Sequence, residues 1–499
     1  MKKVQGGNCL PLGRLLVLAA LVSQAMPGLA APKVKAAANA ATAKLILAST
    51  EPTSPPAAGE RMDAGRPVMD AVPPVPEKGF PSATPTSADD GIPLEQLVDV
   101  IKKALASNPE VGMAAANRRA ATEEFAQAKA ANLPTVDLRV AGGREQSENA
   151  TTIAATGNDR SLTRREAGLT LRQNLFDGGY ISHEVARQEK REEAAEARLR
   201  ESREAIAFKV TDAYLEVQRN QQLMRLAEEN LKTHLDIMAK SEERFKSGAG
   251  NKADYQLAEG RTALANATYV TRLGALQESR AKYIRAVGVP PGNLVTPKPL
   301  ATTPISLELA SEMGLAGHPS LAALRDEVAA AKAAVSAARS RHSPIVDLEL
   351  AANKNRDMGG SPGPSDSNTA MLVMRYNLFR GGADDAKIRE TSERETGAIE
   401  ALNNAQRTVE EEIARAWASM TAARDALQYY EIHVKMTEDV LEAYRSQFDI
   451  GKRTMLDLMN SETELFQAKS NLTSGRFNLL LAQHRLVTGM GGLTRSLGL

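Results

Sequence analysis

The sequence predicts a mainly α-helical protein that also contains four β-strands and consists of two copies of one unit. Two long segments, residues 178–248 and 381–451, lack proline and carry apolar side chains at seven-residue spacing, which indicates long helices that pack against neighbours. Between helical segments, apolar and polar residues alternate in short stretches, which is typical of strands with one apolar face. The order of these segments in the first half of the chain returns in the second half.

The composition agrees with long helices and excludes a strongly basic protein. The chain has 499 residues, with 62 Lys and Arg against 61 Asp and Glu, so no excess of positive charge indicates a nucleic-acid partner. Aromatic residues make up only 4%, and Ala, Leu, Glu, Lys and Arg are frequent, as in long helices and coiled coils. The sequence therefore predicts no binding of nucleic acid.

Residues 1–30 have the pattern of a signal peptide. A short apolar run, residues 15–22, follows basic residues, and small side chains up to Ala30 predict cleavage after that residue. The alternative, an anchor helix, requires an apolar run of about 20 residues. Cys9 is the only cysteine and lies before the apolar run, so we expect a mature chain without lipid or disulfides. Residues 31–90 are rich in Pro, Ala, Thr and Ser and predict a disordered leader.

One hexapeptide occurs twice, each time directly before a long helical segment. It reads NLFDGG at residues 174–179 and NLFRGG at residues 377–382. Paired glycines let the backbone turn without side-chain clashes, so each hexapeptide predicts a passage from strand to helix. The junction glycines are Gly178, Gly179, Gly381 and Gly382. Two passages are expected because the chain contains two copies of the unit.

In each long segment the apolar residues at seven-residue spacing form a row that we call the seam. The two seams indicate single helices of roughly 70 residues, or about 100 Å at a rise of about 1.5 Å per residue. The seam positions are Val210, Val217, Met224, Leu231, Met238 and Phe245 in the first segment, and Ile413, Met420, Leu427, Val434, Leu441 and Phe448 in the second. Shorter helical patterns lie at residues 109–132, 252–287, 319–342 and 454–488. Two short helices placed end to end match one long helix, so we expect them to pack along it.

Four short segments predict strands with one apolar and one polar face. Their alternating apolar positions are Val136, Leu138 and Val140, then Leu169 and Leu171, then Val346, Leu348 and Leu350, and finally Leu372, Met374 and Tyr376. The polar residues 145–161 and 353–367 are expected to be loops. Four strands leave two unpaired edges, so the pattern predicts that further copies of the chain complete the sheet.

In these features the chain resembles the TolC family of outer-membrane exit ducts, over residues 92–493. The residues that carry the resemblance are the helix starts Asn108-Pro109 and His318-Pro319, the two LF[DR]GG junctions, and the motifs RFKSG at residues 244–248 and QFDIGKRTMLDLMN at residues 447–460. Each motif alone is weak evidence, but the ordered set occurs in two tandem copies.

This resemblance implies a homotrimer in the outer membrane that extends into the periplasm. Each protomer would give four strands to a shared twelve-stranded β-barrel, because closing three copies into a ring removes every open edge. The barrel would comprise residues 133–177 and 343–380, and a periplasmic helical tunnel residues 91–132, 178–342 and 381–493. Leu169, Leu171, Leu372 and Met374 are then expected to face lipid, and Thr170, Arg172 and Arg375 the lumen.

The resemblance also implies that the tips of two helical hairpins close the channel and meet an adaptor protein. It assigns the aperture to Asp254, Phe448, Arg453, Asp457 and Asn460, and the adaptor-docking tips to Ser247, Gly248, Ala249, Ile450, Gly451 and Lys452. An ionic link from Arg453 to Asp254 and a ring of Asp457 carboxylates are expected. Asn460 and Phe448 depart from the family, which has an acidic residue and a tyrosine there. The alternative is that both aspartates only stabilise helix starts.

The sequence contains no recognisable catalytic or cofactor motif. It has no phosphate-binding loop, no HExxH and no GxSxG, and its histidines are scattered singly. We therefore expect a passive exit duct, not an enzyme, without cofactor or metal. Its partners would be a periplasmic adaptor and an inner-membrane ABC transporter or proton-driven pump. Type I protein secretion is the leading interpretation, and the alternatives are efflux of small toxic compounds and a structural coiled-coil envelope protein without a pore.

Overall fold

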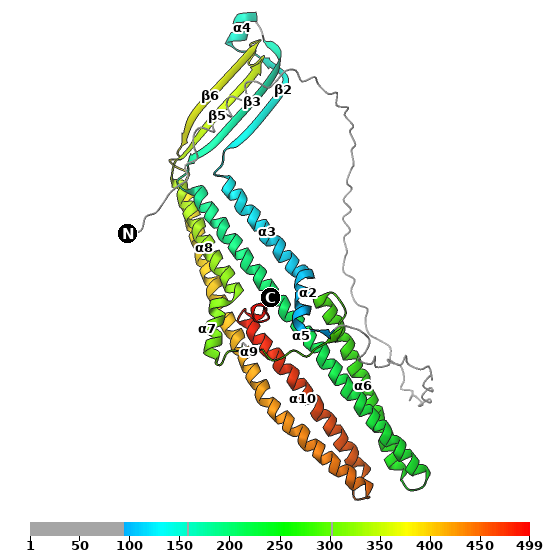
Figure 1. The fold of residues 1–499 in the computed structure, drawn as a ribbon. Helices are drawn as coiled ribbons and strands as arrows, with labels where there is room; N and C mark the ends of the chain where they lie inside the picture. Colours follow the sequence, from blue (N-terminus) through cyan, green and yellow to red (C-terminus); the bar gives the residue numbers. More distant parts are fainter. Residues whose placement is uncertain (1–93, 157–158, 301–302) are drawn as a thin grey trace, which may run out of the picture. The chain divides into compact units, whose positions relative to one another are not determined.

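The structure is a computed structural model that describes residues 94–156, 159–300 and 303–499 (Figure 1). The expected signal peptide and leader lie outside the described residues. The larger elements of the first half are α2 (Leu97–Ser107), α3 (Pro109–Ala130), β2 (Thr135–Ser147), β3 (Arg160–Phe176), α5 (Tyr180–Lys246) and α6 (Lys252–Val287). The second half contains α7 (Leu307–Gly317), α8 (Pro319–Arg339), β5 (Ile345–Arg356), β6 (Pro364–Arg375), α9 (Ala383–Asp449) and α10 (Met455–Gly489). The same order of helices and strands therefore occurs twice.

The two longest helices, α5 and α9, have 67 residues each and coincide with the long segments predicted from the seams. The helix α6 folds back along α5, and α10 folds back along α9. In addition, α3 packs along α5, and α8 contacts both α5 and α9. Each long helix is therefore accompanied by short helices, as the matching lengths predicted. None of the helices in the described part of the chain is long and apolar enough to cross a membrane.

The main core lies around the middle of the long helices. The seam residues Val210, Val217, Ile413 and Met420 are fully buried there, and they pack with side chains from α2, α6, α7 and α10. Toward the end of α5 the seam becomes exposed, since two-fifths of Phe245 is accessible to solvent. The seam thus stabilises the middle of both helices by burial, and near the end of α9 it is still buried at Leu441.

Small elements fasten the loops to this core. The strands β1 (Leu94–Glu95) and β4 (Asn293–Leu294) pair in parallel. The Tyr214 hydroxyl of α5 lies 2.8 Å from the carbonyl oxygen of Glu95 and 2.6 Å from that of Val295. The buried Glu204 carboxylate accepts hydrogen bonds from the amides at the start of α11 (Leu493–Ser496). One long helix therefore holds both the start and the end of the described chain.

Both junctions between sheet and long helix use glycines with positive φ. The angles are 68° at Gly178, 86° at Gly179, 62° at Gly381 and 80° at Gly382. At the first junction a Cβ on Gly178 would lie 2.2 Å from the Cβ of Ser343, whereas no atom lies within 4 Å of one on Gly381. A side chain at any of these glycines would strain the backbone, because φ is positive there. At Gly178 it would also clash with Ser343.

The four long strands form one antiparallel sheet in the order β2-β3-β5-β6. In its register Leu171 lies opposite both Val136 and Leu350, and Leu372 lies opposite Leu348. The predicted apolar positions thus share one face, which we call the apolar face. Thr170, Arg172 and Arg375 belong to the opposite face, which we call the polar face, together with Asp347 and Glu349.

The predicted strand boundaries require correction. The expected loop 145–161 is shorter, because β2 continues to Ser147, β3 begins at Arg160, and α4 (Ala150–Thr156) lies between them. The expected loop 353–367 is likewise shortened by β5 and β6. The ladder hydrogen bonds join backbone groups, so polar side chains do not end it.

Strand β6 ends earlier than its apolar pattern suggested. Tyr376 follows its last residue, Arg375, which already pairs with Ile345 at the start of β5. No residue of β5 is left to pair with Tyr376. Leu378 and Phe379 consequently lie beyond the strand, whereas Phe176 is the last residue of β3.

Candidate functional site

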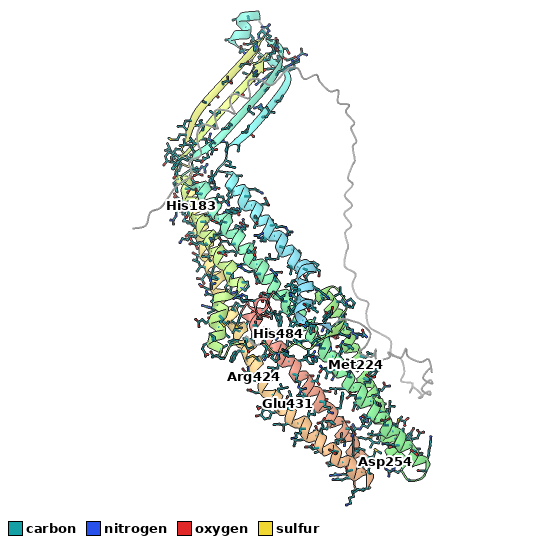
Figure 2. The ribbon with its side chains drawn as sticks, in the orientation of Figure 1. His183, Met224, Asp254, Arg424, Glu431 and His484 are labelled. Carbon is teal, nitrogen blue, oxygen red and sulfur yellow. The ribbon has the colours of Figure 1, made fainter. Side chains whose placement is uncertain are left out.

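The first hairpin tip joins α5 to α6. Its chain turns at Gly248, which has a φ of 74°. The Asn251 side chain caps α6 by accepting a hydrogen bond from the amide of Asp254 at 2.8 Å. The rings of Phe245 and Tyr255 stack across the hairpin with their centroids 6.1 Å apart. This arrangement places Asp254 in the first turn of α6 (Figure 2), where a negative charge is favoured by the helix dipole.

The second hairpin tip joins α9 to α10 and turns at Gly451, with a φ of 72°. The Arg453 side chain folds back on its own hairpin: Nε donates to the Gln447 side chain at 2.9 Å, and the guanidinium lies 4.1 Å from the centroid of the Tyr444 ring. Ile450, three residues before Arg453, is two-thirds exposed. The tip therefore presents an apolar side chain next to a fixed cation.

Asp457 has a structural role in the second tip. Its carboxylate accepts hydrogen bonds from the Thr454 hydroxyl at 2.9 Å and the Thr454 amide at 3.3 Å, while the Thr454 hydroxyl accepts from the Asp457 amide. This reciprocal pair is a capping box at the start of α10. The Thr454 hydroxyl, with smaller contributions from the Thr454 amide and Arg453, lowers the pKa of Asp457, so the carboxylate carries its charge at neutral pH.

The expected aperture residues do not all meet within one chain. Arg453 comes within 3.9 Å of Asp457, whereas the described contacts of a single chain do not join it to Asp254. Phe448 packs instead against a small apolar cluster between the two hairpins. This inter-hairpin cluster consists of Ala258, Met455 and Met459, with Ile237, Met238, Leu257 and Phe448 around it. Phe448 therefore contributes apolar packing between the two hairpins.

Polar groups also join the two hairpins beside this cluster. Arg261 of α6 donates a hydrogen bond of 2.8 Å to the Asn460 side chain of α10. Within the second hairpin, Glu462 of α10 is largely buried and accepts from Arg445 of α9. No local sequence pattern indicates Arg261 or Glu462, because their partners lie on other helices and neither residue belongs to a recognised motif.

His234 is a buried ionisable group of this region that the sequence analysis did not assign. It is almost fully buried on α5, and its carbonyl oxygen accepts from the Thr262 hydroxyl of α6 at 3.2 Å. Burial lowers the pKa of His234, a nearby Glu462 opposes that shift, and Arg261 reinforces it. The imidazole is therefore neutral at pH 7. Within the described residues, no group of three or more His, Cys, Asp or Glu is arranged to bind a metal ion.

The sequence pattern of outer membrane efflux proteins matches residues 100–289 and 310–492, which together are well over half of the chain. This chain belongs to the outer membrane efflux protein family. Its expected resemblance to the TolC family is thereby confirmed. The two matched segments contain both hairpins and both pairs of strands.

Named relatives cover most of this efflux-family chain. It is 26% identical to the outer membrane efflux protein BepC of Brucella suis over 404 residues, which are 80% of this chain and 86% of BepC. It is 23% identical to the outer membrane protein TolC of Vibrio cholerae, over 83% of this chain and 95% of TolC. It is also 24% identical to the alkaline protease secretion protein AprF of Pseudomonas aeruginosa, over 78% and 83% of the two chains.

Solved structures have the same fold. The Campylobacter jejuni CmeC outer membrane channel superposes with a TM-score of 0.70 at 15% identity, covering 80% of this chain and 86% of that one. The open state of the Neisseria gonorrhoeae MtrE outer membrane channel superposes with a TM-score of 0.67 at 18% identity, covering 80% and 89%. With the family match, these findings make the chain an efflux or secretion channel of the outer membrane that extends into the periplasm.

A charged cluster on the polar face of the sheet lies near the helices of this efflux-family protein. The Asp347 carboxylate is nearly inaccessible and accepts hydrogen bonds from Arg172 at 2.6 Å, from Asn174 at 3.0 Å and from Arg375. Glu349 lies 3.8 Å from Arg172 and 3.5 Å from Arg375. The sequence analysis placed both arginines on this face but missed their partners, because identifying them requires the strand register.

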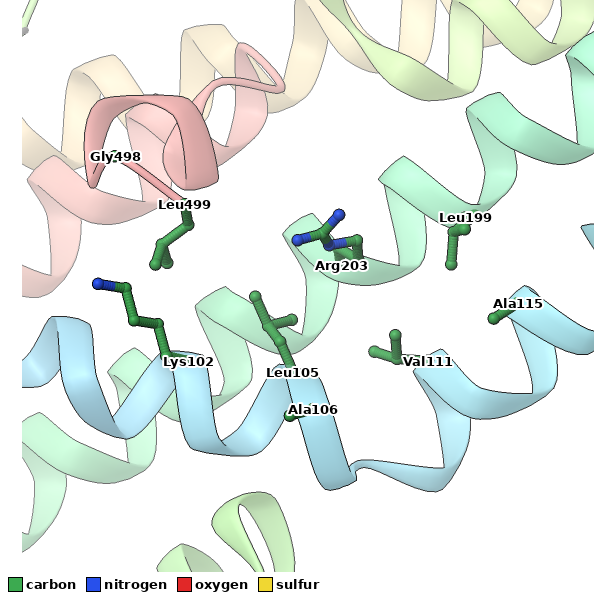
Figure 3. Close-up of a pocket in the computed structure, with 9 residues that line it drawn as sticks. All are labelled: Lys102, Leu105, Ala106, Val111, Ala115, Leu199, Arg203, Gly498 and Leu499. Atoms are coloured by element: carbon green, nitrogen blue, oxygen red, sulfur yellow. The ribbon is translucent and has the colours of Figure 1, made fainter.

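A pocket of about 500 Å³ lies between α2, α3, α5 and the last residues of the chain (Figure 3). Leu105, Val111 and Leu199 form its apolar wall, and Lys102 and Arg203 bring two cations to it. None of its lining residues belongs to the expected aperture or to the adaptor-docking tips. The pocket is thus separate from the channel entrance assigned by the resemblance.

Proposed function

We propose that this protein is the exit duct of a tripartite export system and acts as a homotrimer. Three copies join their four-stranded sheets into one twelve-stranded barrel in the outer membrane. Their helices form a tunnel in the periplasm, which receives substrate from an inner-membrane transporter through a periplasmic adaptor. The chain conducts passively, and the transporter supplies the energy.

The observation that carries this proposal is the two-faced, open sheet. Its edge strands, β2 and β6, each have one partner strand in the described chain, and an unpaired edge cannot remain in lipid. Leu372 and Met374 on the apolar face are each about two-thirds exposed. From Val346 to Ala352 this face extends about 20 Å along β5 at about 3.3 Å per residue. At a strand tilt of about 40° this is roughly 15 Å along the membrane normal, which fits within the apolar band of about 25 Å in membrane barrels.

The hairpin tips are proposed as the periplasmic entrance and the adaptor-docking surface. Asp457 and Asp254 both lie in the first turn after a tip, so three copies around one axis form rings of carboxylates. The carboxylates of such a ring attract cations, and they repel one another across a narrow opening. Ile450, exposed beside Lys452 and Arg453, supports docking of an adaptor through an apolar anchor with a polar surround.

Type I protein secretion is the proposed pathway. The names of two relatives support it, the alkaline protease secretion protein AprF and the proteases secretion protein PrtF. Efflux of small molecules is the second candidate, because the relative BepC is named as an efflux protein and TtgC as a probable efflux pump protein. The transporter selects the substrate in either case, so identifying the transporter decides between the two.

Crosslinking in cells followed by purification tests the pathway. A protein substrate and an ABC transporter caught with the channel support secretion, whereas a proton-driven pump without a protein substrate supports efflux. A structural coiled-coil protein without a pore would yield neither, and it would not migrate as a heat-sensitive oligomer on a gel. Loss of that oligomer on heating is the expected result for the barrel.

Cysteine labelling tests which face of the sheet meets lipid. Leu171→Cys and Arg172→Cys are neighbours on β3 that project to opposite faces. The only native cysteine, Cys9, lies in the expected signal peptide, so each variant carries one reactive thiol. A charged, membrane-impermeant reagent should modify residue 172 and not residue 171. Labelling of residue 171 alone would reverse the proposed orientation of the sheet.

Planar-bilayer recordings test the proposed aperture. Asp457→Asn removes the charge but retains an oxygen that can cap α10, whereas Asp457→Glu retains the charge. Block by multivalent cations should disappear in the first variant and persist in the second. Arg453→Ser should increase conductance by releasing the second tip. Unchanged block in Asp457→Asn would exclude Asp457 from the aperture.

A further inference from the structure

We propose that the apolar face ends in a binding site for a phosphate-bearing lipid headgroup of the outer leaflet. The site is a groove of about 470 Å³ across β2, β3 and β5. Lys354, Arg165 and Arg356 supply its cations, and Val140 and Ala167 supply its apolar side. The inference rests on the proposed function, because it requires the apolar face to meet lipid.

The register places these cations in two adjacent rows. In the first row, Ala167 of β3 lies between Val140 of β2 and Lys354 of β5. In the next row, Arg165 and Arg356 lie directly opposite each other. Both rows belong to the same face as Leu171 and Leu350, since they are separated from those residues by even numbers of positions. The groove therefore continues the apolar face at the end away from the helices.

The pairing of Arg165 with Arg356 is unfavourable without an anion. Like charges directly opposite on neighbouring strands destabilise a sheet. In the described part of the chain, neither arginine nor Lys354 forms an ion pair. Asp366, the cross-strand partner of Lys354, is the acidic residue of these two rows, so three cations face one carboxylate. The groove retains a surplus of positive charge that a phosphate can neutralise.

Three arginines on the polar face, unlike Arg165 and Arg356, are neutralised by carboxylates. Arg164, Arg172 and Arg375 each contact at least one carboxylate there. Glu166 also lines the groove, but its carboxylate is bound to Arg164. Arg139 and Arg160 of the polar face also form no ion pair in the described part of the chain, but neither lies directly opposite another arginine, as Arg165 and Arg356 do. This contrast argues against a general surplus of surface charge.

The space above the arginines is open. Gly142 is the β2 residue opposite Arg165, and a Cβ at Gly142 would have one atom within 4 Å, the carbonyl oxygen of Arg164 at 3.9 Å. On the other side, Pro364 is the β6 residue opposite Arg356. A residue without a side chain and a compact ring thus flank the arginine pair. A guanidinium group can bind phosphate through two parallel hydrogen bonds, which a second guanidinium beside it can reinforce.

The position along the strand fits a headgroup. From Val346 at the helix end of the apolar face to Arg356, β5 extends about 33 Å at about 3.3 Å per residue. At a strand tilt of about 40° this corresponds to roughly 25 Å along the membrane normal, the height of the apolar band in membrane barrels. Since the helices are on the periplasmic side, the groove lies at the level of the outer-leaflet phosphates. The acyl chains would then lie along Val140 and Ala167.

Native mass spectrometry of the intact trimer can test this inference. The protein is transferred from nanodiscs of phosphatidylcholine that contain a diphosphorylated glycolipid, and retained glycolipid is counted. The double variant Arg165→Gln/Arg356→Gln should retain roughly tenfold less, because charge-assisted bonds to the phosphates are lost. The matched control Arg139→Gln/Arg160→Gln removes the same charge from the polar face and should retain the glycolipid normally.

Two further arms identify the ligand. The dephosphorylated glycolipid should not be retained by the native protein, and inorganic phosphate in excess should not displace the diphosphorylated form. Equal retention by both double variants, or displacement by free phosphate alone, would overturn the inference. If retention is unchanged while residue 171 stays protected from the thiol reagent, only the lipid site fails. If residue 171 is labelled from water, the proposed orientation fails as well.

Discussion

The tip between α5 and α6 and the tip between α9 and α10 turn at glycines with nearly equal φ angles, 74° at Gly248 and 72° at Gly451. They differ in what holds the turn. In the first tip, one side chain, Asn251, caps the returning helix, and the rings of Phe245 and Tyr255 stack across the hairpin. In the second, Thr454 and Asp457 cap α10 reciprocally, and Arg453 is bound to its own hairpin.

This difference indicates a division of roles between the two copies of the unit. The second tip carries Arg453, Asp457 and Asn460, which the family resemblance assigns to the aperture, and it is the tip with more local bonds. The first tip contributes Asp254, and its helix start is capped in one direction only. A charged group guides ions only when it is held in position, so the better-fixed tip is the better candidate for the gate. The four predictions that follow test this contrast, beginning with the largest expected effect.

Removing Met459 should separate the two hairpins most strongly. Its side chain is fully buried in the inter-hairpin cluster, and truncating a buried methionine to alanine typically costs about 2–5 kcal/mol. Met459→Ala should therefore increase hydrogen exchange in the tip halves of α6 and α10 and leave the middle of α5 protected. Met436→Ala, at an exposed position of α9, is the control and should change little. Equal effects of both variants would show that the cluster does not hold the hairpins together.

The helix caps give the next largest effect. Replacing a capping side chain by alanine costs about 0.5–2 kcal/mol. Thr454→Ala should lie toward the upper end of this range, because it removes a hydroxyl that both accepts from the Asp457 amide and donates to the Asp457 carboxylate. Asn251→Ala should lie toward the lower end, because the Asn251 side chain makes one capping bond. Hydrogen exchange of the first turns of α10 and α6 measures the two costs. A larger cost at Asn251 would reverse the assignment of the second tip as the better-fixed one.

The sequence predicted the framework of both hairpins closely but not the contacts between them. Apolar periodicity and proline placement were sufficient for α5, α9 and α6, because long helices follow local patterns. The partner of Arg261 depends on how the two hairpins pack, and that of Glu462 depends on how α9 and α10 pair within one hairpin. No local pattern records either contact. The role of Phe448 could not be inferred for the same reason. Its packing against Met455 and Met459 depends on tertiary contacts.

The sheet shows the same limit. Alternation identifies its two faces, but the polar side chains near the strand ends predict loops, whereas backbone pairing continues through them. The buried Asp347 was also missed, because its importance comes from two arginines on neighbouring strands, Arg172 and Arg375. Within a strand, alternation shows which face a residue occupies. The register alone shows which residue lies beside it.

Acid should loosen the contact between the hairpins. The pKa of His234 in the folded protein is lowered by burial, so the unfolded or opened state binds a proton more readily. The stability contribution is therefore fully present above the unfolded pKa of about 6.5 and is lost as the pH falls through the folded value. Glu462 and Arg261 act on the ring in opposite directions. After correction for intrinsic exchange, hydrogen exchange around His234 should rise between pH 7 and pH 5 in the native protein and less in His234→Gln. The same pH dependence in both would exclude His234 as its cause.

The smallest expected effect belongs to the hydrogen bond between Arg261 and Asn460. Because this pair is exposed, its coupling should be about 0.2–1 kcal/mol, measurable by a double-mutant cycle of Arg261→Ala and Asn460→Ala on exchange near the tips. Asn460→Asp is the sharper variant. It changes the contact into an ion pair with Arg261 and adds a second carboxylate near Asp457. It should therefore slow hydrogen exchange near the two tips and also increase block by multivalent cations. At high salt both gains should shrink, because exposed ion pairs are screened. If Asn460→Asp increases block but leaves exchange unchanged, Arg261 does not link the hairpins in the assembled channel, and the side chain at position 460 acts on the lumen alone.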